Sequence, residues 1–205
     1  MAYYRNNVTD KSWQLLMRLK KEYQFVLIGG WAVWLYTEQL KSKDIDIVVE
    51  HSDLEKLKYE YDIEKNERLG KYQFRQGEVE VDVYVPYYSD LGLPAEIVMA
   101  NKQLVDGFWV PRVELLLALK VVSFVARIGS AKGRKDWLDI ISLLNQIENF
   151  EAKKITEWSK HDLVNSGLKL ILDELRLATE VKELGINQHQ MAKIKRGWLN
   201  KLQAG

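Results

Sequence analysis

The segment from residue 25 to residue 50 reads FVLIGGWAVWLYTEQLKSKDIDIVVE, and its pattern decides the fold that we expect. The first four residues form an apolar run, which predicts a buried strand. Gly29 and Gly30 follow and predict a turn that requires an unhindered backbone. A helix is expected over 31–39 and a second strand over 45–49. The chain is therefore expected to be organised around a strand, a glycine turn, a helix and a second strand.

Two carboxylates, Asp44 and Asp46, stand at the start of the second predicted strand. Because strand side chains alternate between faces, both acids are expected on one face, while Ile45 and Ile47 point to the other. Like charges repel at this spacing, and neither acid adds to a core. A divalent cation would relieve the repulsion, and Mg²⁺ takes one or two carboxylates together with water and substrate phosphates. The pair therefore predicts a metal site.

A third acid lies in the clearest strand pattern of the chain, residues 78–85, where valines alternate with polar side chains. Together with 71–75 this segment predicts a hairpin. Asp82 lies on its polar face and would approach the first two acids if the strand pairs with 45–49. Glu80 lies on the same face and is an alternative candidate for the role of Asp82. Backbone N–H groups at the glycine turn and the helix dipole favour a phosphate nearby, and Asp82 could act as base toward an attacking hydroxyl.

Further charged residues follow in the helical part of the sequence. Lys120 and Arg127 are seven residues apart and share a helix face, and both could neutralise phosphates. Asp136 and Asp139 also share a face, and could orient these cations or contact a nucleotide. The basic run 132–135 is expected to be a solvated turn or an RNA contact.

The distribution of patterns predicts an α+β fold in two parts. Residues 1–110 are expected to form a mixed sheet with flanking helices, and residues 111–205 a helical C-terminal part. Within 151–202 the apolar residues recur at helical spacing, which predicts two or three helices interrupted at Gly185 and Gly197.

Composition excludes several classes of protein. The 205 residues carry a net charge of +1, so a nucleic-acid partner would require a local basic patch. The sequence has no cysteine, which excludes disulfides and thiolate zinc sites. We see no signal peptide and no apolar run of membrane-spanning length, and therefore expect a cytoplasmic protein without membrane contact.

Several of these elements, in this order, resemble the nucleotidyltransferase superfamily that includes DNA polymerase β: Gly29-Gly30, Ser42-Lys43-Asp44-Ile45-Asp46 and Val81-Asp82-Val83. The later elements resemble its AbiEii/MenT-like branch, the nucleotidyltransferase toxins of toxin–antitoxin systems: Leu115 to Lys120, Arg127 and Lys135 to Ile140. The resemblance covers about residues 25–147.

The resemblance implies a polymerase β-like core and an enzyme that uses two Mg²⁺ ions, or Mn²⁺, to transfer an NMP from an NTP such as ATP. The acceptor hydroxyl would belong to RNA, such as the 3′ end of a tRNA, or to a protein, and an antitoxin protein is a candidate partner. It assigns metal binding and catalysis to Asp44, Asp46 and Asp82. It assigns nucleotide binding to Gly29, Gly30, Ser42, Lys120, Arg127, Asp136 and Asp139, with Lys120 also catalytic.

One position departs from the family pattern. Members often carry an arginine just before the Ser/Thr-Lys-Asp-x-Asp run, but this chain has Leu40 there, with Lys41 beside it. The departure favours an alternative, a catalytically degenerate member of the same fold that binds nucleotide, RNA or a partner. A further alternative is an interaction module of a toxin–antitoxin pair, whose effect would not depend on the three acids.

Overall fold

The computed structural model of the chain describes residues 6–146, 152–158 and 161–203. It divides into two compact units, Met1–Arg112 and Val113–Gly205. The first contains a five-stranded sheet with helices, and the second is built from helices, so the predicted α+β class is confirmed. The domain division that we predicted after residue 110 stays a prediction. No helix of the described ranges combines the length and apolar character that crossing a bilayer requires.

The sheet of the first unit is mixed. Its strand order is β1-β2-β5-β4-β3, in which β2 and β5 are parallel and the other neighbours antiparallel. The strand expected over 45–49 thus pairs with the strand expected over 78–85, which is the condition on which the approach of Asp82 to the first two acids depended. In chain order the strands are β1 (Val26–Ile28), β2 (Ile45–Val48), β3 (Glu64–Asn66), β4 (Lys71–Gln76) and β5 (Val79–Tyr84).

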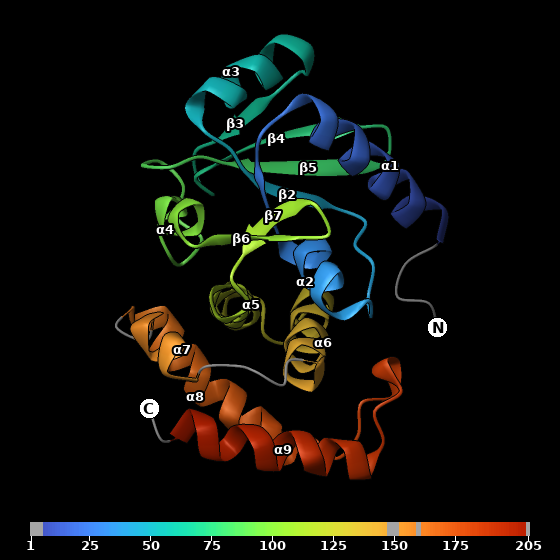
Figure 1. Cartoon of the computed structure of the whole chain (residues 1–205), viewed down its shortest axis with the longest axis vertical. Coiled ribbons are helices and arrows are strands. Elements are labelled where there is room, and N and C mark those ends of the chain that lie inside the picture. The colour runs from blue at the N-terminus through green and yellow to red at the C-terminus, as the bar shows by residue number, and fades with distance from the viewer. Residues whose placement is uncertain (1–5, 147–151, 159–160, 204–205) are drawn as a thin grey trace. The chain divides into compact units, whose positions relative to one another are not determined.

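Helices lie on both sides of this sheet. Figure 1 shows α3 on one side, and α2 and α4 on the other. Helix α1 lies beside β5 and packs against α2, where Trp13 contacts Trp31. Two strands outside the sheet, β6 and β7, form an antiparallel hairpin, and β7 lies beside β1. The elements are α1 (Asn6–Glu22), α2 (Gly29–Thr37), α3 (His51–Glu60), α4 (Ala95–Ala100), β6 (Lys102–Val105) and β7 (Phe108–Pro111). Helix α2 begins directly after β1, so the expected separate glycine turn is replaced by the first residues of the helix.

The second unit is organised around α5, which packs against α6, α7 and α8. Its elements are α5 (Val113–Ala126), α6 (Ala131–Gln146), α7 (Ala152–Trp158), α8 (Asp162–Leu177), the 3₁₀ helix η1 (Lys182–Leu184) and α9 (Gln188–Gln203). Gly185 ends η1 in the left-handed conformation, as expected of an interruption. The interruption that we expected at Gly197 is wrong, because this residue lies within α9. A glycine inside a helix costs only about 1 kcal/mol, and α9 buries Met191, Ile194 and Trp198.

Replacing Gly133 with alanine is expected to destabilise the second unit by about 1–3 kcal/mol, the usual cost of overpacking. A Cβ at this position would lie 2.1 Å from the carbonyl oxygen of Arg127, a backbone atom that cannot rotate away. Gly197→Ala is the matched control, because no atom lies within 4 Å of its added Cβ. That change should stabilise the unit by about 0.5–1 kcal/mol. Urea unfolding measures both, and equal effects of the two substitutions would contradict the packing of α6 against the residues before it.

Candidate functional site

The paired strands β2 and β5 place two of the predicted acids side by side. Asp46 and Asp82 are direct partners in the parallel ladder, and directly paired residues project from the same face of a sheet. Ile45 and Val81, one residue earlier in each strand, point to the other face and are fully buried. Because side chains alternate along both strands, one face of the pair is apolar and belongs to the core, while the other carries the two adjacent carboxylates.

Gly29, at the N-terminus of α2, lies against Asp46. A Cβ at residue 29 would be only 2.2 Å from Oδ2 of Asp46, and its φ of +68° lies in the left-handed region. Glycine alone tolerates both conditions. The first N–H groups of a helix lack intrahelical partners and carry partial positive charge. The structure therefore brings together the glycine, the helix N-terminus and one carboxylate, as the sequence predicts.

The sequence did not reveal the cation that binds Asp82. Lys71 on β4 places its Nζ 2.5 Å from Oδ2 of Asp82, and their side chains are only 10% and 18% exposed. The other carboxylate oxygen, Oδ1, is buried and has no hydrogen-bond partner within the described part of the chain. Lys71 lies two residues from Gln73, the β4 residue that pairs with Asp82, so it projects from the same face. Strand β4 thus contributes a buried ammonium to the polar face of the sheet.

Burial of the Asp82 carboxyl raises its pKa above the ordinary value. The hydrogen bond and the charge of Lys71 act in the opposite direction, while the charges of Glu80 and Asp44 raise the pKa further. Glu80, the alternative to Asp82, pairs instead with Arg75 at 3.1 Å. The raised pKa means that the charged form of Asp82 is costly in the folded protein, and a further cation would reduce this cost.

The described residues contain no group of three or more histidine, aspartate or glutamate side chains that could hold a metal ion. Mg²⁺, however, needs only one or two protein carboxylates and completes its shell with water and phosphate oxygens. Asp46 and Asp82 supply such oxygens from neighbouring strands, and no described residue donates a hydrogen bond to the buried Oδ1 of Asp82. The two acids fit a magnesium ion, whereas the roles of Asp44 and Ser42 stay predictions.

The predicted charged residues of the second unit form a cluster. Nζ of Lys120, on α5, lies 3.2 Å from Oδ1 of Asp136 and 2.8 Å from Oδ2 of Asp139. The Arg127 guanidinium reaches Oδ2 of Asp136 at 3.0 Å. The two acids therefore share a face of α6 and orient Lys120, which was one of the two readings of the sequence. The nucleotide contacts assigned to these residues stay predictions.

Lys135 corrects the expectation of a solvated turn at 132–135. It lies inside α6, is buried, and forms an ion pair with Asp139. Burial lowers the pKa of Lys135, while the charge of Asp139 acts in the opposite direction. In the same run, Lys132 and Arg134 are exposed, as expected. Among the described residues, Lys135 thus joins Lys120 and Arg127 around the carboxylates of Asp136 and Asp139.

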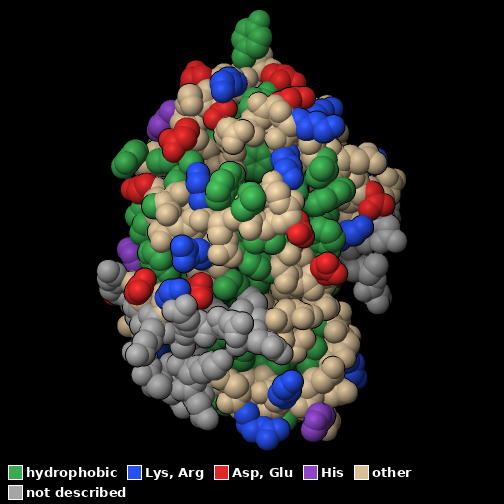
Figure 2. Space-filling view, in the orientation of Figure 1, with side chains coloured by type: hydrophobic (Ala, Val, Ile, Leu, Met, Phe, Trp, Pro, Cys, Tyr) green, Lys and Arg blue, Asp and Glu red, His purple; other side chains and the backbone are tan. Residues whose placement is uncertain are grey.

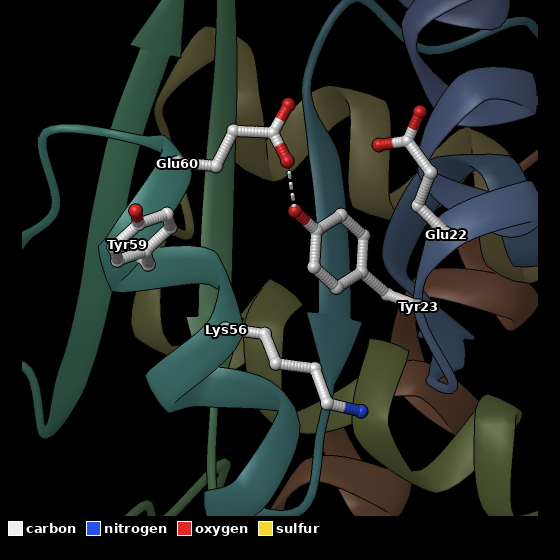
Figure 3. A pocket seen from close by; sticks show the side chains of 5 residues that line it. All are labelled: Glu22, Tyr23, Lys56, Tyr59 and Glu60. Carbon is white, nitrogen blue, oxygen red and sulfur yellow. Dashed lines mark hydrogen bonds between the residues drawn. The ribbon is translucent and has the colours of Figure 1, made fainter.

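A pocket of about 450 Å³ lies between the C-terminal ends of α1 and α3, and none of the predicted site residues lines it. Figure 3 shows the Tyr23 hydroxyl directed at the Glu60 carboxylate, to which it donates a hydrogen bond of 2.5 Å. Burial raises the pKa of Tyr23, and the hydrogen bond and charge of Glu60 raise it further. The pocket is therefore a feature separate from the two acids on β2 and β5.

The face of the molecule drawn in Figure 2 gives no single direction for an RNA acceptor. Figure 2 shows lysine and arginine side chains interspersed with acidic ones over the face in view. Among the described residues drawn there, no continuous basic patch is visible, which agrees with the net charge of +1.

Comparisons with known proteins relate the chain to others by fold. No protein-family model matches it, and no curated protein matches it. Two solved structures from Helicobacter pylori, the protein JHP933 and a candidate nucleotidyltransferase, each have a TM-score of 0.54 and 14% identity. These alignments cover 98% of this chain, and 95% and 98% of the respective neighbours. An antigenic nucleotidyltransferase-like protein from Paracoccidioides brasiliensis has a TM-score of 0.40 and 20% identity, covering 79% of this chain and 92% of its own. The chain has a nucleotidyltransferase-like fold.

Proposed function

We propose that the chain is a metal-dependent nucleotidyltransferase, which moves an NMP from an NTP to an acceptor hydroxyl and releases pyrophosphate. The observation that carries this proposal is the in-register pair of Asp46 and Asp82, next to Gly29 at the N-terminus of α2. Nucleotide transfer depends on positioning and on neutralising phosphate charge, which a bound cation and a helix N-terminus can both supply. In this proposal, the cation held by the two acids and the N-terminus of α2 act on the same phosphate.

In this proposal Asp46 and Asp82 hold Mg²⁺ or Mn²⁺, and the amide groups of Gly29 and Gly30 receive a phosphate of the NTP. The ion, when bound, supplies positive charge to the phosphate oxygens and lowers the pKa of the attacking hydroxyl. Asp82 serves as the acceptor of the hydroxyl proton, since its carboxylate comes from a strand other than that of Asp46.

The acceptor that we propose is RNA, such as the 3′ end of a tRNA, or a protein hydroxyl. This part rests on the resemblance to the AbiEii/MenT-like branch, whose ordered motifs include the helical elements around Lys120 and Asp136. On the same basis we propose that the protein is the toxin component of a toxin–antitoxin pair, with an antitoxin as its partner.

A transfer assay tests the function. The protein is incubated with each of the four α-³²P-labelled NTPs, Mg²⁺ or Mn²⁺, and either total tRNA or a candidate protein acceptor. Label is expected in one acceptor, and Asp82→Asn is expected to abolish it. Glu64→Gln is the matched control, because Glu64 lies in the same row of the sheet, two strands away from Asp82. Absence of label in every arm, or equal transfer by Asp82→Asn, would contradict the proposal.

A second candidate is the catalytically degenerate member that binds nucleotide without transfer. The ion pair between Lys71 and Asp82 favours it, since it occupies a carboxylate oxygen that a metal would use, and Leu40 adds to it. Binding of a labelled NTP without transfer to any acceptor would support this candidate, and turnover would exclude it.

A further inference from the structure

Lys71 places an ammonium group on one of the two carboxylate oxygens of Asp82. Its Nζ is 2.5 Å from Oδ2 of Asp82, and both side chains are largely buried. Asp82 in turn is the direct neighbour of Asp46 in the sheet. One of the carboxylate oxygens available to a metal is therefore already neutralised by an ammonium of the chain itself.

We propose that Lys71 closes the cation site at Asp82 until a nucleotide is present. This inference rests on the proposed function and adds its regulation. A divalent ion at Asp82 would lie within a few ångströms of the Lys71 ammonium, and like charges at that distance in a buried site repel strongly. The ion therefore binds more favourably once Lys71 has left Asp82.

Displacement of Lys71 alone is unfavourable, because it would leave a buried ammonium without its carboxylate. A nucleotide changes this balance, since its phosphates offer Lys71 a new anionic partner while they also bind the metal. Metal and nucleotide therefore bind cooperatively, and by linkage each raises the affinity for the other. Lys71 thereby makes the site prefer a complex of the divalent ion with a nucleotide over the free ion.

Binding of Mn²⁺ to the full-length protein, followed by the EPR signal of the free ion, tests this inference. Wild type is expected to bind Mn²⁺ weakly alone and more tightly with a non-hydrolysable ATP analogue. Lys71→Met and Lys71→Gln remove the charge and should bind Mn²⁺ without nucleotide about tenfold or more tightly than wild type, which lies within the usual range of coupling between two binding groups. Lys71→Arg keeps the charge and should behave like wild type. Lys65→Met is the matched control on the neighbouring strand, where Lys65 pairs with Glu67.

The inference is overturned if both neutral variants bind Mn²⁺ no more tightly than wild type, or if Lys71→Arg gains as much as they do. Its failure is distinguishable from that of the proposed function. If wild type binds Mn²⁺ with nucleotide and loses this binding in Asp46→Asn, the metal site stands even when Lys71 has no effect. If wild type binds no Mn²⁺ with nucleotide, both the metal site and the role of Lys71 are overturned. Thermal unfolding of each variant shows that the comparison is made between folded proteins.

Discussion

Replacing Asp46 with asparagine is expected to lower the rate of nucleotide transfer by about 10²–10³-fold, the usual cost of removing one preorganised charge from a phosphate or oxyanion site. Asparagine has almost the same shape as aspartate, so the packing against Gly29 is retained. What is lost is the negative charge next to Asp82, and with it half of the proposed carboxylate pair. The measurement is kcat/KM for the NTP at saturating acceptor, together with the urea midpoint.

Glu64→Gln provides the comparison for this prediction. It removes a carboxylate from the same row of the sheet, but from the strand β3 at its edge. Its activity should stay within about threefold of wild type, since distant surface changes are usually small. An Asp46→Asn protein that is folded and retains activity similar to that of Glu64→Gln would show that the pair on β2 and β5 does not carry the chemistry.

Replacing Asp139 with alanine is expected to destabilise the second unit by about 3–5 kcal/mol, the range for breaking a buried ion pair. The Asp139 side chain is 0% exposed and contacts both Lys120 and Lys135. Its removal leaves two buried ammonium groups, of which Lys120 keeps a contact with Asp136. The free energy of unfolding in urea at pH 7 measures the effect.

Asp173→Ala is the matched control for Asp139→Ala, because its side chain on α8 is 66% exposed and its loss should cost at most about 0.5 kcal/mol. The effect of Asp139→Ala should also depend on pH. Burial lowers the pKa of Lys135 below the ordinary 10.5, so the unfolded chain binds more protons between the two values and stability rises with pH there. Because the charge of Asp139 raises the pKa of Lys135, this pKa falls further in Asp139→Ala. The cost of the substitution should therefore shrink as the pH rises from the pKa of Lys135 in the variant to its pKa in the wild-type protein. A cost equal to that of Asp173→Ala would show that the cluster is not desolvated.

The two adjacent acids could be predicted from sequence because local patterns define both strands. The alternation of valines around Asp82 and of isoleucines around Asp46 assigns each acid to the polar face. Burial of the apolar face then allows one register, since a shift by one residue would expose it. The place of Gly29 at the start of the helix was predictable for a similar reason, because a strand followed by two glycines and a helix allows few other local structures.

The partners of the acids could not be predicted, because they depend on contacts between distant segments. Lys71 faces Asp82 only in the observed register of β4 and β5, and several polar side chains of β4 were equivalent candidates in the sequence. Lys135 stands in a basic run that reads as solvated, and its burial follows from the packing of α6 on α5. In both cases the sequence shows the charge, but tertiary structure determines what the charge contacts.

The central claim is that Asp46 and Asp82 together bind a divalent ion at the phosphate of a nucleotide. A crystal structure with Mg²⁺ and a non-hydrolysable NTP tests it most directly. The account predicts an ion with oxygens of both acids in its shell, and a phosphate next to the amide groups of Gly29 and Gly30. A nucleotide bound elsewhere, or a phosphate at this place with Lys71 still on Asp82 and no metal, would contradict it.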